Sequence, residues 1–385
     1  MRAEVVERGS VLASLEEDWQ KTWLRDGQAD VFASPAWFMN WWQYFGESGQ
    51  ALDTLFHYAE GAPATLKVDK RQPYVVVLRD ANDVLAVAPL LRIRSRWRRC
   101  PVTLLTPAIN NHSPRSGFAI AAANPSERRT LVGHIARELK KNSHWDVLLV
   151  DGIPQFAADD QDPLHKACAR RPAAGRVWSH CYIPFDRDWN DFLRAQGRHF
   201  RKRLSQPANA LNELGQVNFQ LLSSLDDIKA GLEAFMAIDA ASWKAESGES
   251  IAHHAVGDYY RALALRFANQ DACHLWLLKL DDQPAASFLC LIHKEIVYLI
   301  KTSYKQEFAS ARHSPGRVLL AHMIEHYWKN GWLAMDCVGR MPFVERWTQQ
   351  CIAFQPWFGY SARPLGRLLG GIDRLRDRFG REVHA

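Results

Sequence analysis

The sequence lacks a long hydrophobic run, because no stretch approaches the roughly 20 apolar residues that a membrane-spanning helix needs. Its first residues, MRAEVVERGSVLASLEEDW, are too charged for a secretory signal peptide, so we expect a cytoplasmic protein. The sequence also lacks a C-x-x-C motif. Its 7 cysteines are scattered and odd in number, which argues against a disulfide framework or a thiolate metal site and favours thiols in the core.

A strong excess of charge is also absent. The formal net charge is +6 at pH 7 over 385 residues, and 47% hydrophobic with 23% charged residues is ordinary for a globular protein of two domains. The positive charge is nevertheless uneven. Basic clusters occupy residues 92–98, where arginines alternate with mostly apolar residues, 198–204, and 363–381. Each cluster is either a solvated face or a surface that attracts a phosphate-bearing ligand, nucleic acid or an anionic membrane.

The most informative pattern is an internal repeat. Residues 74–95 and 274–295 both predict a hairpin of apolar strands. Downstream of each hairpin, residues 131–152 and 318–339 both predict a helix and then a buried strand that ends in glycine. The repeat therefore predicts two related α/β domains, with a boundary in the irregular stretch at 155–176.

The two copies differ at the turn before the helix. The second copy has RHSPGRV, whereas the first has NPSERRT and no glycine. A turn that brings backbone amides against a diphosphate favours glycine, since a side chain would block the approach. Only the second copy is therefore expected to hold a phosphate-bearing cofactor.

Short motifs, taken in their order along the chain, resemble a known family. The hairpin around KLDDQPAASFL, the strand EIVYLIKTSY, the turn SPGRVLL and the strand LAMDCVG resemble the GNAT acyltransferase fold. The tandem arrangement resembles the FemAB-like branch, most closely the CelD-like acetyltransferases of cellulose biosynthesis. The motifs of that family in the N-terminal half fall on Phe32, Ser34, Pro35, Trp37, Pro89, Leu90 and the loop 110–115.

The resemblance implies an α/β fold of two tandem GNAT-like domains, each with a mixed, largely antiparallel sheet flanked by helices. We expect a degenerate N-terminal domain at residues 1–175, which supplies a wall of the substrate cleft, and an acyl-CoA-binding domain at residues 176–362. Residues 363–385 are expected to form a basic amphipathic tail. We favour packing of this tail onto the second domain over contact with the inner membrane surface.

The resemblance also implies a donor, acetyl-CoA or another acyl-CoA, and no metal. In GNAT enzymes the pyrophosphate of the donor sits on a loop that corresponds here to His313, Ser314, Pro315, Gly316, Arg317 and Val318. His313 and Val318 depart from the usual residues at the ends of that loop. Pantetheine would pass between two splayed strands and contact Tyr298 and Ile300, and a backbone amide within residues 298–301 would stabilise the oxyanion.

Acyl transfer from a thioester needs an acid for the leaving thiolate and a base for the acceptor. Tyr304, just past the strand, is the candidate acid, and the alternative is a packing role. The candidate bases are Asp239, Glu246 and Asp336. Asp336 lies in an apolar strand, where burial would raise a carboxyl pKa, although a structural aspartate at a strand end is equally consistent.

Two polar segments are candidates for contact with the acceptor. The first is a loop over the cleft in which Trp243 offers an aromatic surface and Lys244 a charge, unless it is a simple surface loop. The second contains His112, Ser113 and Arg115, and Arg115 would bind a carboxylate or phosphate of the acceptor.

The helix of the second copy also contains the H-x-x-E-H spacing of some zinc peptidases, at His322, Glu325 and His326. At about 100° per residue these side chains lie opposite the apolar stripe of the helix, and no third ligand falls in a recognisable pattern. We therefore interpret them as the polar face of the helix, and expect no metal site.

Together these features predict an acyl-CoA-dependent N-acyltransferase that acts on an amine or hydroxyl of a saccharide, envelope or other small-molecule precursor. One alternative is a FemAB-like transferase that takes its aminoacyl group from aminoacyl-tRNA, which would use the basic clusters at 92–99 and 198–203. Another is a non-catalytic binding module with a degenerate cofactor loop. The sequence gives neither the acceptor nor the acyl length.

Overall fold

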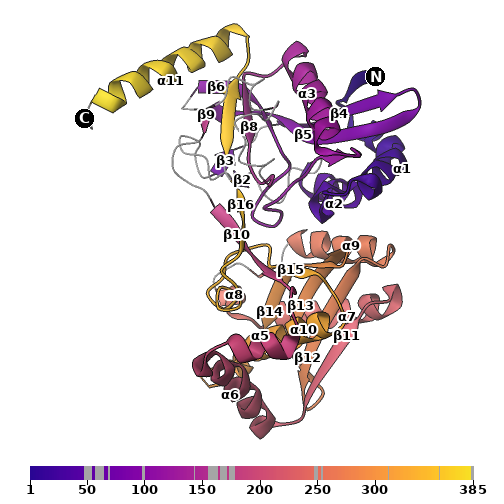
Figure 1. The fold of residues 1–385 in the computed structure, drawn as a ribbon, viewed down its shortest axis with the longest axis vertical. Helices are drawn as coiled ribbons and strands as arrows, with labels where there is room; N and C mark the ends of the chain where they lie inside the picture. The colour runs from indigo at the N-terminus through magenta and orange to yellow at the C-terminus, as the bar shows by residue number, and fades with distance from the viewer. Residues whose placement is uncertain are drawn as a thin grey trace. The chain divides into compact units, whose positions relative to one another are not determined.

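The chain forms an α/β structure of two compact units, in agreement with the predicted fold class (Figure 1). Unit 1 comprises Met1–Trp178 and Ala353–Ala385, and unit 2 comprises Ser179–Ile352. The computed structural model describes residues 1–46, 54–56, 65–67, 70–97, 100–142, 144–154, 164, 171–172, 178–246, 250–252, 255–310, 312–354 and 356–382. Arg98 and most of the predicted boundary at 155–176 lie outside the described residues.

Unit 1 is built on a mixed sheet. Among its neighbouring strands whose register is determined, one pair is parallel and the others are antiparallel. The strands follow the order β1 (Arg2–Val6), β4 (Lys70–Asp80), β5 (Asp83–Trp97), β6 (Cys100–Thr106), β8 (Val147–Val150), β17 (Trp357–Tyr360) and β9 (Arg171–Pro172). β7 (Ala119–Ile120) also pairs with β5, and β2 (Thr54–Phe56) pairs with β3 (Thr65–Lys67) apart from this sheet. β6 and β8 form the parallel pair.

Two helices of unit 1, α2 and α3, begin at good capping residues. Asn124 accepts a hydrogen bond from the Glu127 amide at 3.0 Å at the start of α3 (Pro125–Lys141), and Ser34 accepts one from the Trp37 amide at 3.2 Å at the start of α2 (Pro35–Trp41). Short segments at Val31–Ala33 and Trp42–Gly46 flank α2. α1 (Gly9–Arg25) packs on β5 and buries Trp19.

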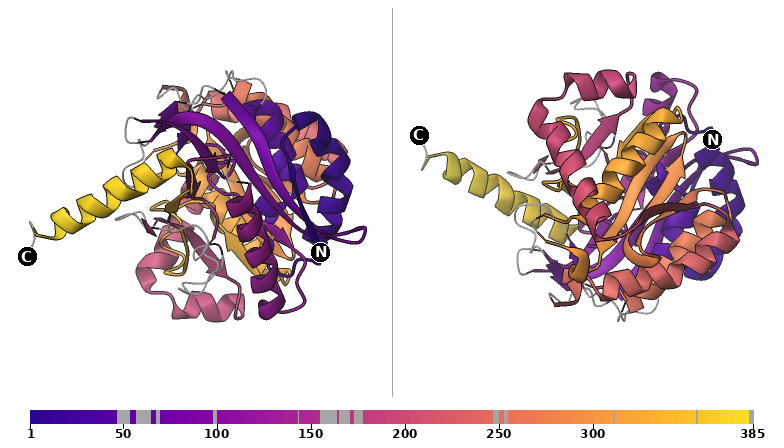
Figure 2. Two further views of the ribbon diagram at one scale, coloured as in Figure 1. Left: turned by 90° about the horizontal axis from the view of Figure 1, so that it is seen from above. Right: turned by 90° about the horizontal axis from the view of Figure 1, so that it is seen from below.

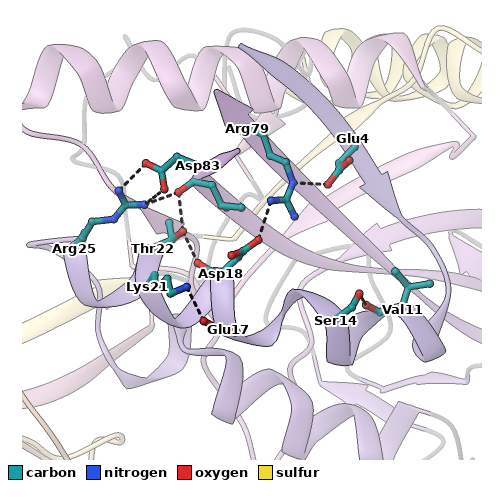
Figure 3. Close-up of polar contacts among 11 residues, drawn as sticks. Glu4, Val11, Ser14, Glu17, Asp18, Lys21, Thr22, Arg25, Arg79 and Asp83 are labelled. Atoms are coloured by element: carbon teal, nitrogen blue, oxygen red, sulfur yellow. Dashed lines mark hydrogen bonds and ion pairs between the residues drawn. The ribbon is translucent and has the colours of Figure 1, made fainter. Parts of the chain in front are cut away.

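Polar contacts fix α1 against the β4–β5 hairpin (Figure 3). Arg25 pairs with Asp83 at 2.8 Å, and Arg79 pairs with Asp18 at 2.8 Å. These pairs are partly exposed and contribute little each. The Val84 oxygen adds a buried link to the helix, because it accepts hydrogen bonds from Thr22 Oγ1 and from Arg25 Nη2, both 2.8 Å long.

Unit 2 is built on a second mixed sheet. The order of its strands is β11 (Val217–Leu222), β12 (Cys273–Leu280), β13 (Gln283–His293), β14 (Ile296–Tyr304), β15 (Ala334–Asp336), β10 (Trp178–Pro184) and β16 (Cys351–Phe354). β14 and β15 are parallel, whereas β11 to β14 are linked by antiparallel pairing and β15 pairs with β10 in the same way.

Helices cover both faces of this sheet. α7 (Leu225–Ala240) and α9 (Ala255–Ala268) pack together on one face. α10 (Pro315–Lys329) lies on the other face beside α6 (Arg198–Leu214) and α5 (Trp189–Ala195), as Figure 2 shows on the right. The buried side of α10 carries Leu319, Met323 and Tyr327. The shorter helices are α8 (Trp243–Glu246) and Gln306–Phe308.

The predicted internal repeat is confirmed by the topology. In unit 1 the hairpin β4–β5 leads to β6, then α3, then β8 parallel to β6. In unit 2 the hairpin β12–β13 leads to β14, then α10, then β15 parallel to β14. The same order of elements therefore produces the same pattern of pairing twice.

The C-terminal part of the chain corrects one expectation. The sequence-based division assigned residues 353–362 to the second domain and favoured packing of the tail there, whereas the structure places Ala353–Ala385 in unit 1. β17 pairs with β8, and α11 (Pro364–Glu382) packs on β17. Leu369 is buried in this contact, and Tyr360 donates a hydrogen bond to Asp373. The physical reason is that β8 pairs with β6 on one side only. Its backbone N–H and C=O groups on the other side need hydrogen-bond partners, which β17 supplies.

Candidate functional site

The most distinctive feature of unit 2 is the point where β14 and β15 part. They pair only through Ile296 with Ala334, Val297 with Met335, and Tyr298 with Asp336. β14 then continues to Tyr304, whereas the chain after Asp336 turns to β10, and the Cys337 amide donates to the Cys181 oxygen at 3.0 Å. Within the described residues, the second half of β14 therefore has no partner strand on this side.

A β-bulge lies at the same place. Leu289 of β13 faces Lys301 and the next residue, Cys290, faces Leu299, so Ile300 is the extra residue of β14. A bulge bends its strand and redirects the local backbone groups. The bulge falls inside residues 298–301, where the sequence predicted a backbone donor for an oxyanion, and its extra residue lies two positions after Tyr298, the last residue that pairs with β15.

The predicted cofactor turn begins α10. Ser314 precedes the first turn without capping it through its side chain, and Pro315 occupies the first helical position. The amides of Arg317 and Val318 donate to the Ser314 oxygen at 3.0 and 3.1 Å. The preceding turn is closed by Ser310, whose hydroxyl accepts the His313 amide at 2.9 Å.

Gly316 lies in a tight contact that the sequence did not reveal. A Cβ atom at this position would lie 3.0 Å from Cδ1 of Tyr304, closer than side chains ordinarily approach. The sequence predicted glycine here because a diphosphate needs the bare backbone. The structure supplies another reason, since the ring of Tyr304 packs directly on the glycine. It also brings together the candidate acid and the candidate cofactor turn.

Asp336 lies at the end of β15 and is 1% exposed. Its Oδ1 accepts a hydrogen bond from the Val338 amide at 2.9 Å and lies 4.0 Å from Nδ1 of His180. His180, on β10, is 3% exposed. His180 was not among the residues predicted from the sequence, although it is the single histidine of the apolar strand WSHCYIP. The two residues form a buried pair next to the place where β14 and β15 part.

The predicted loop over the cleft is held to β14 by Lys244. Its ammonium group donates to the Thr302 oxygen and, at 3.2 Å, to Ser303 Oγ, and it lies 3.6 Å from Oδ2 of Asp239. Trp243 is 42% exposed and Glu246 is also exposed, at the end of α8. Lys244 therefore fastens the loop, whereas Trp243 and Glu246 face solvent.

Asp239 is fully buried and makes several hydrogen bonds. Ser303 donates to Oδ2 at 2.5 Å, and Ser250 and the Ile251 amide donate to Oδ1 at 2.9 and 2.8 Å. Burial raises the pKa of Asp239, but the Ser303 hydrogen bond and the Lys244 charge outweigh it, so the pKa lies below its ordinary value. A carboxylate held in this way is a poor base, and the geometry favours a structural role for Asp239.

The acceptor candidates of unit 1 lie in a tight loop. Asn110 accepts hydrogen bonds from the amides of His112 and Ser113, both at 2.9 Å, and the ring of His112 stacks on Phe45. Ser113 is buried. Arg115 is 2% exposed and forms an ion pair with Asp30, so its guanidinium group is committed inside unit 1 and the expectation that it binds the acceptor loses its basis.

The histidines of H-x-x-E-H pack against aromatic rings. His322 stacks on Phe219 with ring centres 3.8 Å apart, and His326 lies edge-on to Trp276 at 5.0 Å. Burial lowers the pKa of both histidines. The two histidines are thus half-buried against β11 and β12. The expected polar face of the helix is found only at Glu325 and Lys329, whose side chains pair at 2.6 Å. Across the described ranges, no group of three histidine, cysteine or acidic residues is arranged to hold a metal.

Comparison with known proteins places the parting strands within a recognised domain. Residues 198–342 match the family described as "Acetyltransferase (GNAT) domain". This range begins at α6 and includes β14, α10 and β15. No curated protein sequence matches the chain.

Two solved structures resemble the whole chain. FemX is 13% identical, with a TM-score of 0.57 over 96% of this chain and 99% of that chain. A conserved protein of unknown function from Bacteroides thetaiotaomicron VPI-5482 is 10% identical, with a TM-score of 0.52 over 93% of this chain and 100% of that chain. At these identities the likeness concerns the fold, and it extends over both units.

Proposed function

We propose that the protein is an acyl-CoA-dependent N-acyltransferase, whose donor site is formed by β14, β15 and the start of α10. The observation that carries the proposal is the parting of β14 and β15 after Tyr298 and Asp336, beside the bulge at Ile300 and the first turn of α10. All of these lie within the stretch that matches the GNAT domain family.

Where β14 and β15 part, backbone N–H and C=O groups of β14 can form hydrogen bonds with an extended ligand arm. The arm would then pair with β14 in the way that an additional strand does. The first turn of α10 offers the positive end of a helix dipole to the phosphates of the donor. His313, Ser314, Pro315, Gly316, Arg317 and Val318 form this turn, and Tyr298 and Ile300 lie on the strand. An acyl-CoA supplies both an extended amide-containing arm and a diphosphate, so one ligand satisfies both features.

The reaction needs two proton transfers. Tyr304 packs on Gly316 at the cofactor turn, and its hydroxyl is our candidate to protonate the leaving thiolate. For the base we favour Asp336 with His180, because the pair lies at the end of β15, next to the bulge that would supply the oxyanion donor. Glu246, exposed on α8, remains the second candidate for the base, and Trp243 with Lys244 for contact with the acceptor.

The test is calorimetric binding of acetyl-CoA to the wild type, to Gly316→Val and to Tyr304→Phe. Valine at position 316 would collide with Tyr304 and distort the turn, so we expect at least about tenfold weaker binding. Tyr304→Phe keeps the ring, so the affinity should be retained, while thiol release with a panel of amine acceptors should fall by about 10- to 100-fold if Tyr304 is the acid.

Gly27→Val is the matched control, since a side chain at Gly27 meets nothing within 4 Å. Thermal unfolding shows whether each variant is folded. Unchanged acetyl-CoA affinity in folded Gly316→Val would remove the donor assignment. Failure of the wild type to bind any acyl-CoA or tRNA would favour the non-catalytic binding module instead.

The acceptor class is a finer part of the proposal. The resemblance to CelD-like proteins suggests a saccharide or envelope precursor, with an amine or hydroxyl as the acylated group. A transferase that takes its donor from aminoacyl-tRNA is the second candidate. The exposed arginines Arg94 and Arg96 and the exposed basic residues at the start of α6 favour it, because such patches bind nucleic acid. Tight tRNA binding that weakens steeply with salt, without acyl-CoA binding, would select it.

We also propose that α11 contacts an anionic membrane surface. Its side away from β17 exposes Leu368, Ile372 and Leu375, at 60%, 40% and 56%, and these residues recur at helical spacing. Arg367 and Arg374 are exposed beside them. A helix with an apolar stripe and basic flanks binds anionic lipid interfaces by burial and charge attraction together. None of the helices in the described ranges is long and apolar enough to cross a membrane.

A further inference from the structure

Two cysteines of unit 2 lie on neighbouring strands. Cys181 belongs to β10 and Cys351 begins β16, and these two strands are adjacent in the sheet. Both thiols are free. Among the cysteines that the structure describes, only Cys351 is exposed, whereas Cys181 is 4% exposed. The sequence predicted thiols in the core, which holds for Cys181 and not for Cys351.

Two contacts fix the register of β10 against β16. The Tyr182 amide donates a hydrogen bond to the Gln350 oxygen at 3.0 Å, and the ring of Trp178 stacks on Phe354 with centres 4.1 Å apart. Both contacts fit a single antiparallel register, because four steps back along β10 correspond to four steps forward along β16. β10 and β16 are therefore antiparallel, with Tyr182 opposite Gln350.

This register places Cys181 directly opposite Cys351, so both side chains project from the same face of the sheet. The backbone of Cys181 points the other way. Its amide donates to the Gly339 oxygen at 2.9 Å, and its oxygen accepts a hydrogen bond from the Cys337 amide at 3.0 Å. Cys181 and Cys351 therefore form a non-hydrogen-bonded pair, in which the Cα atoms lie about 4.5 Å apart. Disulfides span Cα distances of about 4.4 to 6.8 Å, so these two thiols can be joined with little movement of the strands.

Cys337 is the other cysteine beside Cys181, and its position suits a disulfide less well. Its amide bonds to the Cys181 oxygen, and side chains that face each other across such hydrogen bonds lie farther apart. Cys337 is also 1% exposed and packs in the core of unit 2. An oxidant in solution therefore reaches Cys351 and not Cys337.

We propose that Cys181 and Cys351 form a reversible disulfide and are thus an oxidation site of unit 2, in addition to the proposed acyl transfer. The oxidant is a small disulfide of the glutathione type. The Cys351 thiolate attacks one sulfur of the oxidant, whose S–S bond breaks and releases one thiolate. The Cys181 thiolate then attacks the sulfur of Cys351 and releases the second thiolate. Two protein thiols lose two protons and two electrons, and one small disulfide becomes two thiols.

The surroundings of the two thiols assign their order of attack. Cys351 attacks first, because the thiolate that meets the oxidant must be accessible. Burial raises the pKa of the Cys181 thiol, and the charge of Glu345 raises it further, whereas Arg340 lowers it. Only a small fraction of Cys181 is ionised at neutral pH, so the closing step should become faster as the pH rises.

The disulfide would join the two strands that carry the chain into and out of unit 2. This unit extends from Ser179 to Ile352, so Cys181 and Cys351 lie close to its two ends in the sequence. A cross-link between them closes a loop that contains nearly the whole unit, and it restricts the unfolded chain far more than the folded one. Oxidation should therefore stabilise unit 2. Because one sulfur lies at the surface, a thiol in solution can reverse the link.

The test treats the full-length protein with glutathione disulfide, blocks the remaining thiols by alkylation, and maps the cysteines by mass spectrometry after digestion with trypsin. Cys181, Cys337 and Cys351 fall on three different peptides, because arginines separate them. We expect a linked pair of peptides that carries Cys181 and Cys351 and that disappears when dithiothreitol is added. The oxidised protein should unfold about 4 to 10 °C above the reduced protein.

Cys351→Ser and Cys181→Ser should each abolish the linked peptides and the rise in unfolding temperature. Cys351→Ser changes an exposed side chain, so this variant should unfold at nearly the same temperature as the reduced wild type and remains informative if Cys181→Ser does not fold. Cys100→Ser is the matched control, since Cys100 lies on β6 of unit 1. It should keep both the linked peptides and the rise.

The outcomes separate a disulfide site from a merely reactive surface thiol. If Cys351 carries glutathione while Cys181 stays free, or if Cys351 links to any other cysteine, the proposal is overturned. Formation of the link without a change in unfolding temperature would overturn the stabilising role of the site. The binding of acyl-CoA is measured separately, so these results leave the proposed function untouched.

Discussion

Asp239 connects three parts of unit 2 through one carboxylate. It joins α7 to Ser303 of β14, to Ser250 of the loop and to Lys244 of α8. The loop that covers the second half of β14 is thereby tied to the strand. At the scale of the residue, the carboxylate acts by holding neighbouring segments together.

Asp239→Asn should lower the free energy of unfolding by about 1 to 3 kcal/mol at pH 7, since buried hydrogen bonds to a charged acceptor are lost. The pKa of Asp239 is lowered from its ordinary 3.8, so its contribution is complete above that value and is lost as the pH falls through the folded pKa. The difference between wild type and variant, measured by urea unfolding, should therefore shrink as the pH falls below about 4.

Glu233→Gln is the control for this prediction, because Glu233 lies on the same helix, is 79% exposed and pairs with Arg261 on the surface. It should change the stability by less than about 1 kcal/mol. A deficit in Asp239→Asn that stays constant down to pH 3 would show that the charge of Asp239 contributes nothing.

At the scale of the element, α11 combines two faces with different roles. One face packs on β17 through Leu369 and Asp373, and close contacts at Gly366 and Gly370 let the helix approach Ser361 and Tyr360. The other face exposes Leu368, Ile372 and Leu375 beside arginines. Packing thus explains Gly366 and Gly370, although glycine weakens a helix in isolation, whereas a side chain at Gly371 would meet nothing within 4 Å.

The membrane proposal predicts that the protein sediments with vesicles containing phosphatidylglycerol and much less with vesicles of phosphatidylcholine alone. The double variant Leu368→Ser, Leu375→Ser should bind at least about tenfold more weakly, since two leucines would otherwise enter the interface. Leu24→Ser, which alters a leucine of α1 that is 58% exposed, is the control. Equal sedimentation of the double variant and the control would refute the contact.

At the scale of the whole molecule, the two units share a topology but differ at the turn that begins the helix. In unit 2, α10 starts with Pro315 and Gly316 after β14. In unit 1, α3 starts with Pro125 and Ser126, and its N-terminus is capped by the side chain of Asn124. That side chain already satisfies a backbone donor that a phosphate would need.

We therefore predict a single donor site per chain. Titration of the full-length protein with acetyl-CoA should give a stoichiometry of about one, and Gly316→Val should weaken that one binding event by at least about tenfold. A second binding event that survives in Gly316→Val would assign a donor site to unit 1. Asn124→Ala provides the complementary measurement, because loss of the cap should lower the stability by about 1 kcal/mol without affecting donor binding.

Much of the fold was predictable from local patterns. The hairpins at 74–95 and 274–295 correspond to β4–β5 and β12–β13, because two apolar strands around a polar turn have few other structures. The buried strands after the helices, β8 and β15, were also expected. The end of the second domain was not predicted correctly, because nothing in residues 357–360 shows that they pair with β8 of the first unit.

The sequence by itself determined the repeat, the types of element and the position of the candidate cofactor turn, since these depend on periodicity and on the conformational preferences of glycine and proline. Only the tertiary structure decided that Tyr304 packs on Gly316, that His180 lies beside Asp336, and that Cys181 faces Cys351. These contacts join residues that are distant in the chain, and they follow from the order and register of strands, which no local pattern specifies.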